Sequence, residues 1–224
     1  MKKVLLKNRY TGIPIGDNFP IIVNCNVGIN SNSDYNAEIE KIDRLFARTN
    51  STPDTMMDLS ICSDSPSIAK YIIDSHHIPV GTVPTYTVSS NKGIAKNALI
   101  ETIIQYAEYG VAFMTMHFTA DRDIYQIAKN DRKIPTTSRG GAAVLFDLYK
   151  TNKKENIYLE NIDDIISIAK KYNFVISLGA TFRPAGIIDA CDNPHILETE
   201  KQRELCHYIQ SRGVSVIVEN VGHI

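Results

Sequence analysis

Short apolar runs alternate with amphipathic helical patterns along most of this 224-residue chain. About six runs have the length and composition of buried strands, namely 21–24, 56–60, 80–84, 111–117, 174–179 and 214–218. Apolar residues at helical spacing separate them, as at Ile39, Ile42 and Leu45. Strands that alternate with helices form parallel sheets covered by helices, so the pattern predicts an α/β fold. Because no GxGxxG turn is present, it favours a (β/α)8 TIM-type barrel over a dinucleotide-binding sheet.

A complete barrel of this type has eight strands, so the chain is expected to form an apparently incomplete one. We expect an N-terminal extension at 1–20 and a partial barrel domain at 21–224. Residues 139–160 lack a clear period and are expected to be less regular. The predicted helices are 34–48, 66–75, 93–109, 121–130, 161–172 and 198–211.

Charge and composition exclude several classes of partner. The formal net charge is -1, with 24 Lys and Arg against 25 Asp and Glu, so no basic surface argues for nucleic acid or for an anionic membrane. No stretch approaches the 18 or so apolar residues of a membrane-spanning helix, and we expect a cytoplasmic protein. The four cysteines form no CxxC pair, which excludes a local zinc ribbon or iron–sulfur motif and predicts buried free thiols.

Polar or ionisable side chains occur at the end of nearly every predicted strand. In a parallel barrel the carboxyl ends of the strands meet at one rim, where catalytic groups gather. The sequence therefore predicts a functional site at this rim. Its members along the chain are Asn26, Asp58 and Ser60, Tyr86, His117, the segment Ser138-Arg139-Gly140-Gly141, Arg183, and Glu219 with His223.

The segments around these residues resemble, in order, the motifs of the phosphomethylpyrimidine synthase family, which makes the pyrimidine of thiamine. The resemblance covers most of the chain. It rests on Asn24-Cys25-Asn26-Val27-Gly28, Met57-Asp58-Leu59-Ser60, Pro79-Val80-Gly81-Thr82-Val83-Pro84-Thr85-Tyr86, His117, Ser138-Arg139-Gly140-Gly141, Ser177-Leu178-Gly179 with Arg183-Pro184, and Glu219 with Gly222-His223.

The resemblance implies a radical S-adenosylmethionine enzyme that rearranges 5-aminoimidazole ribotide into hydroxymethylpyrimidine phosphate. It also implies a 4Fe-4S cluster on a C-terminal cysteine motif, a divalent metal, zinc or iron, held by His223, and a homodimer in the full-length form. That cysteine motif and a second metal-binding histidine would lie beyond Ile224, so we expect a truncated form of the enzyme. The implied substrate contacts are Asn26, Met57, Tyr86, His117, Ser138, Arg139, Gly140, Arg183 and Glu219.

These residue types suit a ribotide. A guanidinium, a hydroxyl and closely approaching backbone N–H groups, as in the Ser138-Arg139-Gly140 loop, bind phosphate well. Arg183 could add positive charge, and Glu219 could accept a hydrogen bond from an amine or a ribose hydroxyl. Taken singly, the same residues have ordinary interpretations, with His117 a hydrogen-bonded core histidine, Met57 a core filler and Arg139 part of a solvated turn.

Three alternatives stay open at this stage. Where the family usually has Asp-Gly-Leu-Arg, this chain has Ala180-Thr181-Phe182-Arg183, which is consistent with a divergent relative such as a 5-hydroxybenzimidazole synthase of anaerobic cobamide biosynthesis. A non-catalytic ribotide-binding remnant would also explain the intact phosphate loop without cluster cysteines. A non-radical lyase would have to use His117 and Glu219 as acid and base on one substrate atom.

Overall fold

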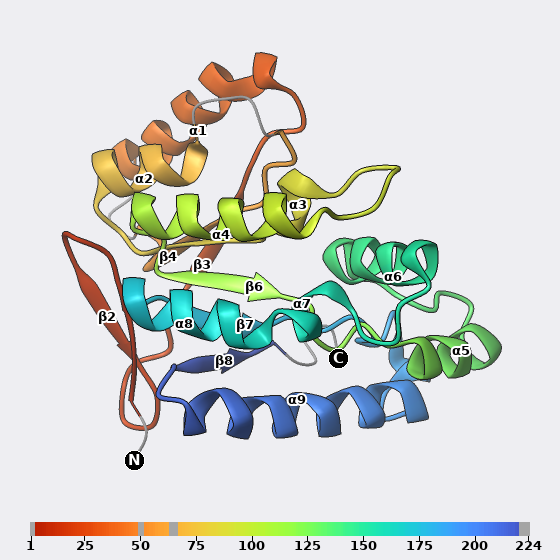
Figure 1. Ribbon diagram of the computed structural model, residues 1–224. Coiled ribbons are helices and arrows are strands. Elements are labelled where there is room, and N and C mark those ends of the chain that lie inside the picture. The colour runs from red at the N-terminus through yellow and green to blue at the C-terminus, as the bar shows by residue number, and fades with distance from the viewer. Residues whose placement is uncertain (1–2, 49–51, 63–66, 220–224) are drawn as a thin grey trace.

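A six-stranded, curved parallel sheet forms the centre of the computed structural model, which describes residues 3–48, 52–62 and 67–219 (Figure 1). The strands follow one another in chain order across the sheet, as a barrel requires. This confirms the predicted α/β fold and partial TIM-like barrel. The sheet strands are β3 (Asn24–Val27), β4 (Thr55–Asp58), β5 (Val80–Thr82), β6 (Phe113–Met116), β7 (Val175–Leu178) and β8 (Val216–Val218).

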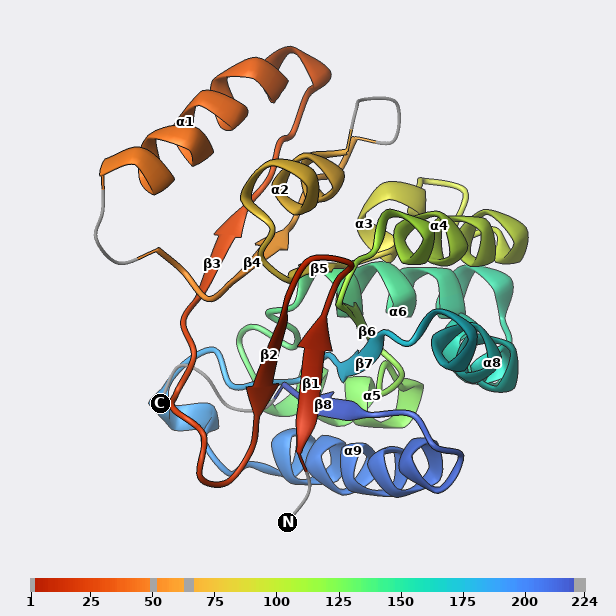
Figure 2. The same ribbon diagram turned by 90° about the vertical axis from the view of Figure 1, so that its left-hand side faces the viewer.

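Helices fill the connections between strands and lie outside the curved sheet (Figures 1 and 2). Among the described residues, none of these helices is both long and apolar enough to cross a bilayer. The helices are α1 (Tyr35–Arg48), α2 (Ile68–His76), α3 (Thr85–Val88), α4 (Lys96–Tyr109), α5 (Arg122–Asp131), α6 (Arg139–Thr151), α7 (Ile157–Glu160), α8 (Ile162–Tyr172) and α9 (Asn193–Ser211), with short 3-10 turns at Asn32–Asp34 and Ile187–Asp189.

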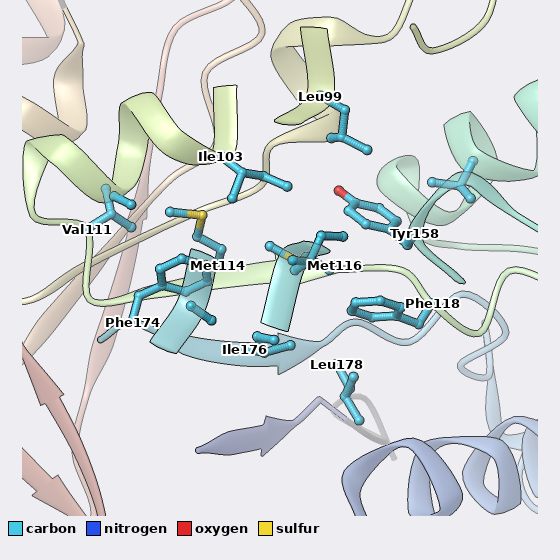
Figure 3. Close-up of a cluster of buried hydrophobic side chains, with 14 of the residues drawn as sticks. Leu99, Ile103, Val111, Met114, Met116, Phe118, Tyr158, Phe174, Ile176 and Leu178 are labelled. Carbon is cyan, nitrogen blue, oxygen red and sulfur yellow. The ribbon is translucent and has the colours of Figure 1, made fainter. Parts of the chain in front are cut away.

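Side chains of the central strands alternate between two environments. Met114 and Met116 of β6 point outward and share a buried apolar cluster with Leu99 and Ile103 of α4 (Figure 3). The intervening residues, Thr115 among them, face the barrel interior instead. Because of this alternation, Thr115 places a hydroxyl inside the barrel while the outer face of β6 stays apolar.

A two-stranded hairpin covers the amino-terminal ends of the sheet (Figures 1 and 2). Its strands are β1 (Val4–Lys7) and β2 (Gly12–Ile15), paired antiparallel. Leu6 of β1 is buried in an interior cluster with Phe113 and Val175, so the hairpin closes the end opposite the predicted site. The division of the chain at residue 20 stays a prediction.

The first sheet strand differs from the one expected at 21–24. Ile21 and Val23 are 97% and 62% exposed, and the strand begins only at Asn24. The apolar run was misleading because β3 pairs with β4 through a more polar segment, in which Asn26 lies beside Met57.

The expectation of irregular structure at 139–160 was wrong, because α6 and α7 occupy most of this segment. The buried face of α6 carries Gly140, Gly141 and Asp147, while Phe146 is 49% exposed. The same face also buries Val144, Leu145 and Leu148, but the small and charged residues beside them, with an aromatic residue outside, weaken the hydrophobic period that would have indicated a helix.

Candidate functional site

The carboxyl-end rim collects the predicted site residues from most of the barrel strands. His117 directly follows β6, and Glu219 directly follows β8. Arg183 lies in the turn after β7. The predicted metal ligand His223 lies outside the described residues. The other predicted positions are Asn26 in β3, Met57 and Asp58 in β4, Ser60 just after β4, Tyr86 in α3, and Ser138, Arg139, Gly140 and Gly141 at the start of α6.

His117 lies at the base of the site and is only 3% exposed. Its Nε2 is 2.6 Å from the Ser138 hydroxyl, and its Nδ1 is buried with no hydrogen-bond partner among the described residues. Burial, with a smaller contribution from the Arg183 charge, lowers the pKa of His117 to about 3. The side chain is therefore a neutral imidazole at neutral pH.

The low pKa of His117 predicts a specific loss of stability in acid. Between pH 6.5 and about 3 the unfolded chain protonates this histidine and the folded chain does not, so the free energy of unfolding falls as the pH falls. We expect up to about 1.4 kcal/mol per pH unit in urea unfolding, absent from a His117→Gln variant. The two curves should run parallel above pH 7, and curves parallel down to pH 4 would contradict the prediction.

The Ser138-Arg139-Gly140-Gly141 segment was expected to be a loop and is instead the start of α6. Ser138 is the N-cap, and its hydroxyl accepts a hydrogen bond from the Gly141 N–H at 3.1 Å. Gly140 packs on the imidazole so closely that a Cβ there would lie 2.3 Å from Cε1 of His117. A helix begins at this point because Ser is a good N-cap, and the amino-terminal end of a helix favours an anion.

Arg139 and Tyr86 line the same side of the rim. The Arg139 guanidinium carbon lies 5.6 Å from the centre of the Tyr86 ring, a cation–π distance. Both residues, together with Asn26, line an open hollow of about 410 Å³. Burial raises the pKa of Tyr86, as does the Glu219 carboxylate, whereas Arg139 and Arg183 lower it. The charges of two arginines and one glutamate therefore all act on the hydroxyl of Tyr86.

Arg183 is held by a turn that many side chains anchor. Its Nε is buried with no hydrogen-bond partner in the described part of the chain. The Glu198 carboxylate of α9 accepts hydrogen bonds from the backbone N–H groups of Thr181 and Phe182, at 2.6 and 2.7 Å. Burial raises the pKa of Glu198 to about 7, against the effect of these donors. Arg132 binds the other side of the turn, through the Phe182 carbonyl at 2.7 Å.

Glu219 is fixed by two hydroxyls inside the barrel. Its Oε1 accepts hydrogen bonds from Thr115 Oγ1 at 2.6 Å and from Ser177 Oγ at 2.8 Å. The sequence analysis gave neither residue a role, although Ser177 stands in one of the family motifs, and it gave none to Glu198 or Arg132. The available signal was a single hydroxyl residue at an inward-facing position of each apolar strand, 111–117 and 174–179.

Metal binding has no support among the described residues. No group of three His, Cys, Asp or Glu side chains there could hold a metal ion. The four cysteines are free, as expected, but the expectation that they are buried was wrong: Cys191 is exposed, and Cys25, Cys62 and Cys206 are intermediate. These cysteines therefore do not fit an iron–sulfur cluster.

Comparison with known proteins identifies a family for nearly the whole chain. The model of the radical SAM ThiC family matches residues 2–224. A phosphomethylpyrimidine synthase of Saccharolobus islandicus is 35% identical over 222 residues, which are 95% of this chain and 50% of that protein. The same enzyme of Thermotoga petrophila is 30% identical over 236 residues, covering 100% of this chain and 55% of that protein. The chain thus spans about half the length of these curated relatives.

Solved structures add little to this assignment. Dihydropteroate synthase from Thermus thermophilus aligns with 97% of this chain and 94% of its own, at 13% sequence identity and a TM-score of 0.30. A similarity this low carries no argument about function.

Proposed function

The chain belongs to the radical SAM ThiC family, and from this premise we propose that its rim site binds 5-aminoimidazole ribotide for conversion to hydroxymethylpyrimidine phosphate in thiamine biosynthesis. The observation that carries the proposal is the surroundings of Tyr86. The charges of Arg139 and Arg183 lower the pKa of its hydroxyl, and the charge of Glu219 raises it. A ribotide has the matching pair of ends, an anionic phosphate and a ring with an amine donor.

The proposed pose follows from these charges. The phosphate binds at the start of α6, where the Arg139 guanidinium offers charge-assisted hydrogen bonds and the positive end of the helix dipole favours an anion. Arg183 extends the cationic side, and its Nε has no partner among the residues that the structure describes. Glu219 accepts a hydrogen bond from the amine or from a ribose hydroxyl. Asn26 lines the hollow beside Arg139 and Tyr86, and Met57 is its neighbour in the β3–β4 pairing.

His117 acts in this pose as a neutral hydrogen-bonding group. Ser138 engages Nε2, and Nδ1 is buried with no partner among the described residues, so Nδ1 is the atom that the substrate would engage in this pose. Tautomer choice lets a neutral imidazole donate or accept at Nδ1.

S-adenosylmethionine and a 4Fe-4S cluster supply the radical chemistry in full-length members of the family. The cysteines of this chain do not fit the cluster, so the proposed role of the described residues is to bind and orient the ribotide. The proposal extends to a divalent metal, zinc or iron, at His223, to a homodimer of the full-length form, and to a cytoplasmic location.

Calorimetric titration of the chain with aminoimidazole ribotide tests the proposal. We expect saturable binding, and binding at least about tenfold weaker for the riboside, which lacks the phosphate. Arg183→Ala should weaken ribotide binding by a similar factor, whereas the matched control Arg212→Ala, a surface arginine stacked on Tyr208, should leave it unchanged. Equal affinity for ribotide and riboside would contradict the phosphate assignment, and no binding would overturn the proposed function.

A second candidate, 5-hydroxybenzimidazole synthesis from the same ribotide, is favoured by the turn after β7. Ala180, Thr181 and Phe182 are buried there and contribute no carboxyl group, where the family motif has an aspartate. Anaerobic incubation with S-adenosylmethionine and reductant separates the candidates through the mass of the product. Ribotide binding without any product would favour the non-catalytic role.

A further inference from the structure

Two buried hydroxyls share one oxygen of the Glu219 carboxylate. We propose that Thr115 and Ser177 are positioning residues, which lock Oε1 of Glu219 so that Oε2 faces the ligand as the acceptor. This inference deepens the proposed function and rests on it.

The two hydroxyls are placed by the strand pairing itself. Thr115 of β6 and Ser177 of β7 are direct partners in the parallel ladder, and both face the barrel interior. They are 2% and 1% exposed. Neighbouring strands are less than about 5 Å apart, so both side chains can reach one atom above them. A hydroxyl has a single donor hydrogen, and each of these is used on Oε1, at 2.6 and 2.8 Å.

The backbone of Glu219 is fixed as firmly as its side chain. Its N–H donates to the Leu178 carbonyl at 3.0 Å, which continues the β7–β8 pairing by one residue. The buried Gln202 of α9 donates from Nε2 to the Glu219 carbonyl at 2.9 Å and to the Leu178 carbonyl at 3.3 Å. With the main chain and Oε1 both held, rotation of the carboxylate would break two buried hydrogen bonds.

The remaining oxygen, Oε2, accepts no hydrogen bond from the described residues. In the proposed site its lone pairs serve the ligand, and the held carboxylate does not have to reorganise when the ligand binds. Pre-organised acceptors of this kind bind a donor more strongly than mobile ones, because they lose little conformational entropy when the ligand binds.

A double-mutant cycle tests whether the hydroxyls act through Glu219. Removing both, in a Thr115→Val and Ser177→Ala double variant, is expected to weaken aminoimidazole ribotide binding by about tenfold in calorimetry. In a Glu219→Ala background the same two changes should have no further effect, because no carboxylate is left to position. The single change Thr115→Ser retains a hydroxyl and should retain the affinity of the unmodified chain.

Thr82→Val is the matched control. Thr82 lies in neighbouring β5 and is 1% exposed, and its hydroxyl has no hydrogen-bond partner among the described residues. The same loss of a buried hydroxyl should therefore leave ribotide affinity unchanged.

Failure of the proposed function and failure of the positioning role give different results. An unmodified chain that does not bind the ribotide overturns the proposed function and this inference with it. If the chain binds the ribotide and Glu219→Ala weakens binding, but the hydroxyl variants do not, or their effect persists in the Glu219→Ala background, only the positioning role is overturned.

Discussion

Replacement of Arg132 with methionine is expected to lower the free energy of unfolding by about 3–5 kcal/mol. The side chain of Arg132 is 1% exposed and that of its partner Asp192 is 21% exposed. The guanidinium binds both carboxylate oxygens, with Nε and Nη2 each at 2.6 Å. Methionine fills a similar volume, so the main loss is the pairing itself, which leaves a mostly buried carboxylate without its cation.

The same substitution should also weaken ligand binding. Arg132 Nη1 donates to the Phe182 carbonyl at 2.7 Å, and Thr136 donates to the neighbouring Thr181 carbonyl at 2.7 Å. Without Arg132 the turn that carries Arg183 loses one of its anchors. Ribotide affinity should therefore fall by about tenfold or more, even though Arg132 does not contact the proposed substrate.

Urea unfolding followed by circular dichroism measures the first effect. Arg212→Met is the matched control, because Arg212 and Asp163 form a pair that is 41% and 74% exposed at 3.6 Å, and such pairs contribute about 0–1 kcal/mol. Asp192→Asn removes the charge and keeps a side chain that caps α9 well, so it separates pairing from capping. A loss below about 1 kcal/mol for Arg132→Met would show that the pair does not hold the turn.

The sequence predicts the order of strands and helices in this protein better than the contacts between its side chains. Five of the six apolar runs coincide with parallel strands, because buried strands have few other ways to bury such residues, and the run at 21–24 lies just before β3. The placement of His117 and Glu219 at the rim follows from the order of the strands alone, since residues after parallel strands share one end of the sheet.

The contacts that position those residues were beyond sequence reasoning. Ser138 reaches His117 across 21 residues, and Thr115 reaches Glu219 across 104. Such pairs depend on the register and curvature of the sheet, which no local pattern encodes. The start of α6 was missed for a related reason: its glycines look like a loop, but their small size serves the close approach to the imidazole.

Gly140→Ala is expected to abolish ribotide binding, with affinity reduced by more than about a hundredfold. A Cβ at this position would lie 2.3 Å from Cε1 and 2.7 Å from Nδ1 of His117. The imidazole has little room to move, because the Ser138 hydroxyl lies 2.6 Å from Nε2 and the backbone of Gly179 packs against the same side of the ring. Either α6 or His117 must shift, and both belong to the proposed binding surface.

The sign of the stability change is informative because alanine is the better helix former. In an open helical site the substitution would stabilise the fold by up to about 1 kcal/mol. At Gly140 we expect a loss of about 1–3 kcal/mol instead, since overpacking moves backbone or side chains. Gly186→Ala is the control, because the Cβ there would meet nothing within 4 Å. Calorimetric titration that finds the two variants equal in ribotide affinity would place the binding surface away from His117 and the start of α6.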